Sequence, residues 1–403
     1  MKYNKDYFAH ARVGLFTHYT YATYRKKENY GGTHYSQNNP VGASSAEEVA
    51  AMFDGEKYAA TAHDLGAEYV VFTLCHAGFN LLFPSKVMGA LCPHKCTAGS
   101  DAVQKLIDGL SRYDIPLILY MPPNDEHDIT DDDLKAMGVY QDHKAMTAFL
   151  KRLIREIFDR YGDKICGFWF DQCGPDREVC DFVRECNPNA VVFINTGVTA
   201  NETQHENSDF LVSEYYGSIE SCDSDTLPVH YSQVNRQIGN WWAAGGKAPT
   251  DAPNLYRYTV RTIAVEGQYN CGIAWSCGPY IDQTWEEGVR QLLTDLGTLL
   301  RDHEGIYGTV PGRSYVERPN AVLTKEMWGV STEAPDGKTV YLHILNRPED
   351  GLLRLPEPAD GKSFREAWYG TEKLSLSHDT EGYTIALPTE TDPIDTVVRL
   401  LAE

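Results

Sequence analysis

The chain has 403 residues, 42% of them hydrophobic, and its 57 acidic and 36 basic residues give a formal net charge of −21. This length is enough for one large domain with a smaller one, or for two to three average domains, and the hydrophobic content argues against intrinsic disorder. Because the negative charge repels polyanions, we expect neither nucleic acid nor an anionic membrane surface as a partner. No apolar run reaches the roughly 18 residues of a membrane span, and the first residues lack a signal-peptide pattern.

Ten cysteines are scattered along the chain, and together with the missing signal pattern they predict a cytoplasmic protein without disulfides. The segment CPHKC places Cys92 and Cys96 on either side of His94. No second pair of ligands stands at the spacing of a zinc finger. We therefore predict a surface loop with two free thiols there, no metal site and no cofactor.

Short apolar runs alternate with helical patterns over the first three hundred residues. Near-continuous apolar runs are typical of parallel strands that helices cover. The predicted strands are 13–19, 69–75, 115–121, 167–172, 190–196, 209–215, 229–235 and 271–278, of which the seventh is the weakest. The predicted helices are 45–65, 101–113, 132–160, 253–266 and 284–303.

This alternation predicts an α/β fold with a (β/α)8 TIM-like barrel over residues 1–311. A doubly wound sheet is the alternative, but no nucleotide-binding fingerprint follows the first strand. After residue 312 the strands follow one another without helices, which predicts a small C-terminal antiparallel β-sandwich over 312–403. Its strands are expected at 338–347, 351–356, 363–370, 383–388 and 395–402.

Two acids stand where predicted barrel strands end, which is where barrel enzymes place their active sites. Asp171 ends the apolar run GFWFD, and Glu214 ends the sixth strand. Two carboxylates suit glycoside hydrolysis, in which one attacks the anomeric carbon and the other protonates the leaving oxygen. Metal hydrolysis fits less well, because the segment FTHYT at the first strand carries a single histidine.

Aromatic, imidazole and amide side chains stand at the other predicted strand ends. Aromatic rings can cover the apolar face of a sugar ring, while imidazole and amide groups can bond its hydroxyls. Taken singly, several have a structural alternative: a turn cap for Asp171, an ion pair for Glu214, a hydrogen-bonded structural role for the two histidines, and core packing for the two tryptophans. Their convergence favours a sugar-binding site. Its expected members are His18, His76, Tyr120, Trp169, Asn195 and Trp275.

These motifs resemble the α-L-fucosidases of glycoside hydrolase family 29 over nearly the whole chain. The segment FWFDQ is similar to the family's W-F-D strand, which carries the nucleophile, and SDFLVSE (208–214) is similar to G-D-F-x-T-P-E. The segment LGTLLRDHEGIYGTVPG (296–312) resembles another family motif. Weaker similarities cover 11–24 and 59–86.

The resemblance implies a barrel followed by a β-sandwich and an exo-acting enzyme that removes a terminal α-L-fucosyl or fucose-like residue from glycans. It implies a retaining mechanism with Asp171 as nucleophile. For the acid/base we choose Glu214, with Glu220 and Glu206 as alternatives.

Several family positions carry other residues here. The paired histidines are Cys75-His76, the following Asp is Ala77, the Trp-Gly after the first histidine is Tyr19-Thr20, and Gly197 replaces an arginine. Losing donors that bond sugar hydroxyls can change specificity strongly. An α-glycosidase for another sugar and a catalytically silent carbohydrate-binding relative therefore remain alternatives. Trp241 and Trp242 are expected to form an aglycone platform or to pack their loop.

Overall fold

The structure is a computed structural model of the chain. It describes residues 2–21, 41–122, 129–171, 174–196, 205–215, 233–237, 250–264, 272–315 and 327–403. For 213–215 and 233–237 it describes the backbone only.

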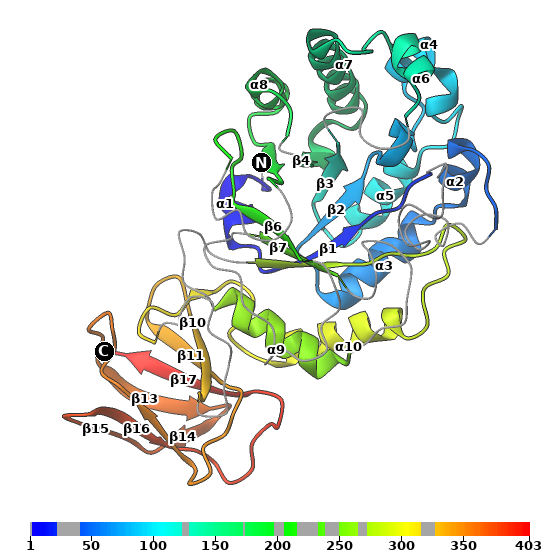
Figure 1. Ribbon diagram of the computed structural model, residues 1–403. Helices are drawn as coiled ribbons and strands as arrows, with labels where there is room; N and C mark the ends of the chain where they lie inside the picture. Colours follow the sequence, from blue (N-terminus) through cyan, green and yellow to red (C-terminus); the bar gives the residue numbers. More distant parts are fainter. Residues whose placement is uncertain are drawn as a thin grey trace.

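Eight parallel strands form one curled sheet with the order β5-β4-β3-β2-β1-β8-β7-β6 (Figure 1). An isolated parallel bridge between Phe193 and Phe210 links the two ends of this order. The strands are β1 (Val13–Thr17), β2 (Tyr69–Thr73), β3 (Leu117–Met121), β4 (Ile165–Phe170), β5 (Val191–Ile194), β6 (Val212–Tyr215), β7 (Gln233–Gln237) and β8 (Gly272–Ser276).

The two faces of the sheet build two separate hydrophobic clusters. Side chains from one face pack on one another across the curl; this inner cluster includes Phe16 of β1, Val71 of β2 and Ala274 of β8. Phe8 of the short helix α1 (Lys5–His10) joins it. Side chains from the other face pack under the helices in an outer cluster. The sheet is therefore curled around its own apolar inner face.

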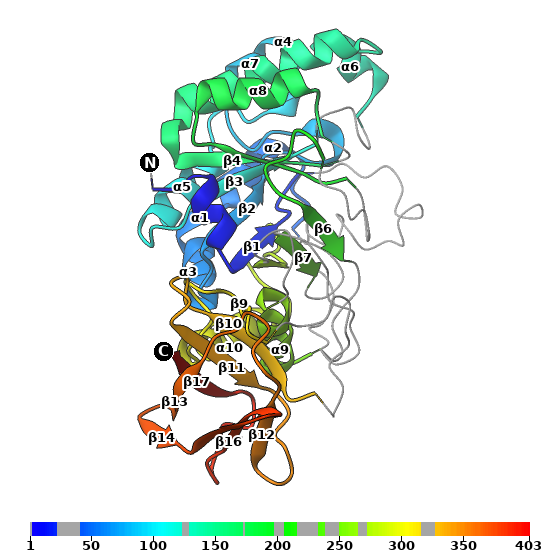
Figure 2. The same ribbon diagram turned by 90° about the vertical axis from the view of Figure 1, so that its left-hand side faces the viewer.

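Helices cover the outer face and account for the alternating sequence pattern (Figures 1 and 2). Those between β1 and β5 are α2 (Ala46–Met52), α3 (Gly55–Leu65), α4 (Lys86–Leu91), α5 (Ala102–Ser111), α6 (Asp131–Met137), α7 (His143–Tyr161) and α8 (Arg177–Cys186). The later ones are α9 (Ala252–Ile263) and α10 (Val289–Asp302). Between β5 and β7 the described residues contain no helix.

Two helices predicted as single elements are each split by local signals. The 45–65 prediction breaks where the side chain of Asp54 accepts a hydrogen bond from Lys57 N and so caps α3. The 132–160 prediction breaks at Gly138, whose φ of 74° ends α6 in the left-handed region that glycine tolerates. Helix α8 was not predicted, although it follows a Pro-Asp pair that is typical of a helix start.

The C-terminal part of the chain is antiparallel. One sheet has the order β14-β13-β17-β11-β10-β9 and the other β12-β16-β15, and apolar side chains of both form a shared core. Their strands are β9 (Val310–Pro311), β10 (Gly329–Glu333), β11 (Thr339–Ile344), β12 (Leu352–Leu355), β13 (Phe364–Tyr369), β14 (Glu372–Leu374), β15 (Leu376–Asp379), β16 (Gly382–Ala386) and β17 (Thr396–Ala402). Both views place these sheets beside α9 (Figures 1 and 2).

The α/β prediction is thus confirmed as a curled parallel sheet with additional antiparallel sheets. A complete (β/α)8 barrel is not established, because no described helix separates β5, β6 and β7. The boundary at residue 312 stays a prediction.

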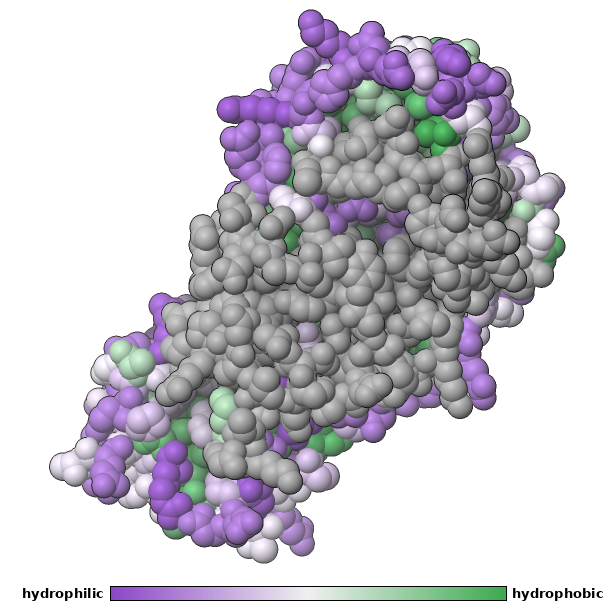
Figure 3. Space-filling model, in the orientation of Figure 1, coloured by the Kyte–Doolittle hydropathy of each residue, from purple (hydrophilic) through white to green (hydrophobic). Residues whose placement is uncertain are grey.

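Hydrophilic side chains cover the helices in the upper part of the view in Figure 3. Of the helices described, none has both the length and the apolar character needed to cross a bilayer.

Candidate active site

Asp171 directly follows β4, at the edge of the sheet where the parallel strands end. Its backbone N–H donates to Met121 O at 3.3 Å, and the neighbouring strand continues alongside, with Asn195 N donating to Phe170 O at 2.9 Å. These backbone bonds bring β3, β4 and β5 together around the carboxylate. Asp171 is half-buried, so its side chain keeps access to solvent.

The carboxylate of Asp171 is held from both sides. The hydroxyl of Tyr120 donates to Oδ2 at 2.6 Å, and Nδ2 of Asn195 donates to Oδ1 at 2.8 Å. The two oxygens thus accept hydrogen bonds from two different places in the sheet, Oδ2 from β3 and Oδ1 from the residue that follows β5. These contacts fix the orientation of the carboxylate.

Four of the predicted site residues pack ring to ring next to Asp171. Tyr120 stacks on His76, with ring centroids 5.4 Å apart and planes at 5°, and on Trp169, at 5.3 Å and 25°. His18 lies 4.7 Å from His76 and 4.6 Å from Tyr120 between centroids. Tyr120 and Trp169 are fully buried, whereas His18 and His76 keep 5% and 6% of their surface exposed. The imidazoles thus stand nearer to solvent than the rings that support them.

Burial sets the protonation of His18. Mainly because of desolvation, and secondly because of the positive charge that His76 can carry, the pKa of His18 is well below 6.5. The ring is therefore neutral at physiological pH, with one nitrogen donating and one accepting. A neutral imidazole suits the hydroxyls of a sugar.

Trp275 does not reach this group of residues. It belongs to the outer cluster, while its neighbour Ala274 belongs to the inner one. Its indole N–H donates to Oγ1 of Thr259 on α9 at 3.1 Å, and the side chain is fully buried. The structure thus places Trp275 between the sheet and a helix, away from Asp171, because adjacent residues of a strand face opposite sides.

Glu214 lies near the end of β6, and its backbone pairs with Asn235 of β7. Its side chain lies outside the described part of the structure. Of the alternatives, Glu206 is exposed and Glu220 lies outside the described residues. Trp241, Trp242 and Gly197 also lie outside them, as does the side chain of Ala77. The choice of acid/base therefore stays a prediction.

Two of the positions that differ from the family pattern lie in the outer cluster. Cys75 is buried there, and burial raises the pKa of its thiol. Tyr19 donates its hydroxyl to Val49 O at 3.1 Å and Ile281 O at 3.0 Å. Both side chains pack between the sheet and its helices, so these two changes do not alter the ring-to-ring cluster beside Asp171 directly.

The family model for alpha-L-fucosidase matches residues 2–304. The chain belongs to the alpha-L-fucosidase family. The expected enzyme class, a glycoside hydrolase of this family, is confirmed at that level. No curated protein matches the chain in sequence.

Crystal structures of family members have a similar fold. One is an alpha-L-fucosidase of glycoside hydrolase family 29 from Bacteroides thetaiotaomicron, with a TM-score of 0.71, 16% identity, and coverage of 99% of this chain and 94% of that one. Another is alpha-L-fucosidase isoenzyme 1 from Paenibacillus thiaminolyticus, with a TM-score of 0.68, 18% identity, and coverage of 99% of this chain and 98% of that one. A third is the Thermotoga maritima alpha-fucosidase in complex with fucose, with a TM-score of 0.66, 18% identity, and coverage of 99% of this chain and 97% of that one. At these identities the likeness establishes the shared fold.

Proposed function

We propose that the protein is a retaining exo-glycosidase that removes a terminal α-L-fucosyl or fucose-like residue from a glycan. The observation that carries the proposal is the carboxylate of Asp171, held by Tyr120 and Asn195 where β4 ends. Membership of the alpha-L-fucosidase family supports the reaction class. We further propose that the curled sheet closes into the complete (β/α)8 barrel of this fold.

In the first step, Asp171 attacks the anomeric carbon of the sugar while Glu214 donates its proton to the departing glycosidic oxygen. The bond to the aglycone breaks as the bond to Oδ of Asp171 forms. A related structure supports this route: the Bacteroides thetaiotaomicron alpha-L-fucosidase has been trapped as a covalent intermediate with 2-fluoro-fucosyl fluoride.

In the second step, Glu214 takes a proton from water, and the resulting hydroxide displaces Asp171 from the anomeric carbon. The two displacements return the sugar with its original anomeric configuration. This sequence needs the two carboxyl groups to lie about 5–5.5 Å apart. Neutral His18, with His76 beside it, would hydrogen-bond the sugar hydroxyls, and the stacked Tyr120 and Trp169 would hold the imidazoles in place.

Hydrolysis of an aryl α-L-fucoside tests the proposal, with Asp171→Asn as the diagnostic variant. The amide keeps the shape of the side chain but is a poor nucleophile, so turnover should fall by at least about a thousandfold. Asp132→Asn makes the same chemical change on a side chain that is 95% exposed and should keep wild-type activity. Equal activity in both variants would remove Asp171 from the mechanism.

Proton NMR of the first sugar released distinguishes the mechanisms. Retention should give the α-anomer first, whereas immediate formation of the β-anomer would contradict the double displacement. If the wild type is inactive on the fucoside but active on another aryl α-glycoside, the sugar in the proposal is wrong and the reaction stands. If no glycoside or natural glycan is cleaved, while binding of free sugars survives Asp171→Asn, the silent carbohydrate-binding alternative is correct.

A further inference from the structure

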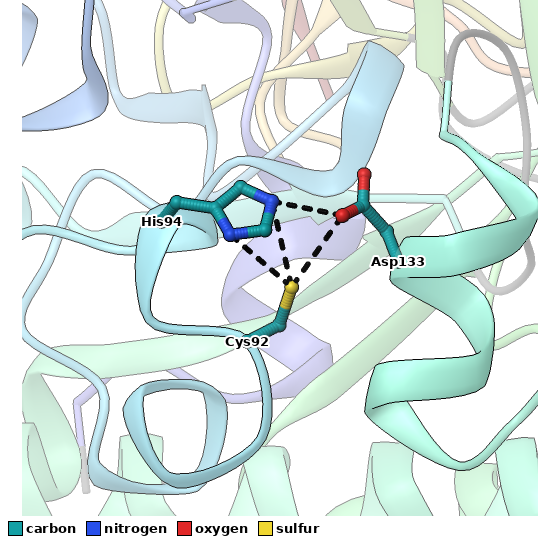
Figure 4. Close-up of side chains that lie close together, drawn as sticks. All are labelled: Cys92, His94 and Asp133. Carbon is teal, nitrogen blue, oxygen red and sulfur yellow. Dashed lines mark hydrogen bonds and ion pairs between the residues drawn. The ribbon is translucent and has the colours of Figure 1, made fainter.

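Away from the active site, the segment CPHKC meets helix α6 and brings three different donor atoms together (Figure 4). The Cys92 thiol, the His94 ring and the Asp133 carboxylate all lie within 4.8 Å of one another. The distances are 3.6 Å from Sγ to Nε2, 3.7 Å from Sγ to Oδ1 and 2.8 Å from Nε2 to Oδ1. The sequence pattern around CPHKC contained no carboxylate, because Asp133 lies 41 residues after Cys92.

The backbone under these three residues is fixed by local hydrogen bonds. Cys92 ends α4, with its N–H donating to Met88 O at 2.7 Å, and begins the 3-10 turn η2 (Pro93–Lys95). Asp133 lies in the first turn of α6, where its N–H donates to Oγ1 of Thr130 at 3.0 Å. Cys92 is buried with 1% of its surface exposed. The donors are therefore presented by ordered secondary structure.

Lys95 fixes the carboxylate from the other side. Its Nζ lies 3.0 Å from Oδ2 of Asp133, and the lysine side chain is only 5% exposed. Burial opposes the charge on Asp133, but the hydrogen bond from Lys95, with that of Thr130, outweighs it and lowers the pKa of Asp133 to about 2. The second oxygen, Oδ1, is left facing Cys92 and His94 as an anionic donor.

The spacing of the donors can be compared with a tetrahedral zinc site. With Zn–S near 2.3 Å and Zn–N and Zn–O near 2.0–2.2 Å, the ligand atoms of a tetrahedron stand about 3.3–3.7 Å apart. The two distances from Sγ match this range. The hydrogen-bonded Nε2–Oδ1 pair would have to widen by about 0.5 Å when the ion replaces the shared proton. The His94 ring would also have to turn, because Sγ lies nearly as close to Nδ1, at 3.7 Å, as to Nε2.

We propose that Cys92, His94 and Asp133 form a binding site for a zinc-type divalent cation. A sulfur, an imidazole nitrogen and one carboxylate oxygen select borderline-soft ions such as Zn²⁺ or Co²⁺ over Mg²⁺ or Ca²⁺. Because the side chain of His94 is 67% exposed, the fourth position opens toward solvent and takes water. The ion links the end of α4 to α6, and Lys95 orients the carboxylate that binds it.

Binding moves two protons. Burial, with the charge of Asp133 second, raises the pKa of the Cys92 thiol to about 11, so the metal-free site holds a protonated thiol. The cation takes the sulfur lone pair as the S–H bond breaks, and this proton leaves to solvent. The proton that Nε2 of His94 shares with Oδ1 of Asp133 moves through solvent to Nδ1, which frees the lone pair of Nε2 for the ion. No oxidant or other reactant is needed.

Titration of the metal-stripped full-length protein with Co²⁺ tests the site. The wild type should develop thiolate-to-cobalt absorption in the near ultraviolet, which added Zn²⁺ removes. Cys92→Ser should lose this absorption. Cys96→Ser is the matched control, because Cys96 is in the same segment but is not one of the three clustered donors, and its Sγ hydrogen-bonds to the Ser85 and Pro93 carbonyl oxygens. It should bind Co²⁺ as the wild type does.

His94→Gln keeps the test decisive if Cys92→Ser does not fold, since the exposed ring contributes little packing. It should weaken Co²⁺ binding at least about tenfold. No absorption in the wild type would overturn the proposal. So would absorption that survives both Cys92→Ser and His94→Gln, or that disappears in Cys96→Ser but not in Cys92→Ser.

Discussion

At the scale of single residues, the hydrogen bond from Tyr120 to Asp171 links the buried aromatic rings to the proposed nucleophile. The hydroxyl is 2.6 Å from Oδ2, and the ring is held between His76 and Trp169. A donor fixed in this way can orient the carboxylate for attack only while its own ring stays in place. In the proposed mechanism Tyr120 therefore has a positioning role in addition to its structural one.

We predict that Tyr120→Phe keeps the fold but lowers kcat about 10–100-fold. A hydrogen bond to a charged group contributes about 1.5–3 kcal/mol, which corresponds to that factor in rate. Kinetics on an aryl α-L-fucoside measure the change. Tyr113→Phe, at a tyrosine that is 38% exposed, is the matched control and should be neutral. Unchanged kcat in Tyr120→Phe would mean that the contact does not position the nucleophile.

The buried imidazole of His18 gives a pH prediction. Its pKa is below 6.5 in the folded chain because of burial and then of His76, so only the unfolded chain gains the proton as the pH falls below 6.5. The free energy of unfolding should therefore decrease on acidification. For one such group the decrease reaches about 1.4 kcal/mol per pH unit.

Urea unfolding of the wild type and His18→Asn between pH 7 and 5.5 measures this contribution. The variant should lose less stability on acidification than the wild type, because the group that takes the proton is gone. If the free energy of unfolding fell equally with pH in the two proteins, this would contradict the lowered pKa of His18.

At the scale of elements, the face of the strand on which a side chain lies decides whether it can belong to the proposed sugar site or packs under the helices. Trp169 of β4 and Trp275 of β8 are both buried aromatic residues near strand ends, but one belongs to the inner cluster and the other to the outer one. The hydrogen bond from Trp275 to Thr259 ties β8 to α9. Trp275 therefore contributes to the packing between the sheet and this helix.

We predict that Trp275→Phe lowers the free energy of unfolding by about 1–3 kcal/mol, through the lost hydrogen bond and the smaller side chain. KM for the fucoside should stay within about twofold of the wild type. Denaturant unfolding and steady-state kinetics measure the two effects. A large rise in KM with unchanged stability would contradict this and would indicate that Trp275 contacts the sugar, as the sequence pattern predicted.

At the scale of the whole molecule, a buried polar network joins the parallel sheet's helices to the C-terminal sheets. Tyr256 of α9 donates to Oδ2 of Asp395 at 2.7 Å, and Nδ1 of His343 in β11 lies 2.7 Å from the same oxygen. His343 is fully buried, and its Nε2 is 3.1 Å from Oγ1 of Thr332. Polar groups buried in this way stabilise only the arrangement in which they meet their partners.

We predict that the chain unfolds in a single transition and that Tyr256→Phe lowers its stability by about 1–3 kcal/mol, because a buried partner loses its donor. Calorimetry checks both statements. Two separated transitions in the wild type would show that the network does not couple the parts. Tyr113→Phe again serves as the control.

The sequence by itself determined the order of the eight parallel strands, the strand ends that carry Asp171, Tyr120 and Asn195, and the family. Continuous apolar runs such as ICGFWF identify buried strands, because parallel strands are apolar on both faces. For the same reason they do not tell which alternate residues face inward, so the opposite faces of Trp169 and Trp275 were decided only by the curl of the sheet.

Contacts between residues far apart in the chain were likewise decided by the tertiary structure. The sequence placed Cys92 and His94 close together, but nothing local indicated that α6 would bring Asp133 to them. The same holds for Tyr256, His343 and Asp395, which meet only after the C-terminal sheets pack on α9. Hydrophobic patterning predicts local elements from a few neighbouring residues, whereas such polar contacts depend on how whole elements pack against one another.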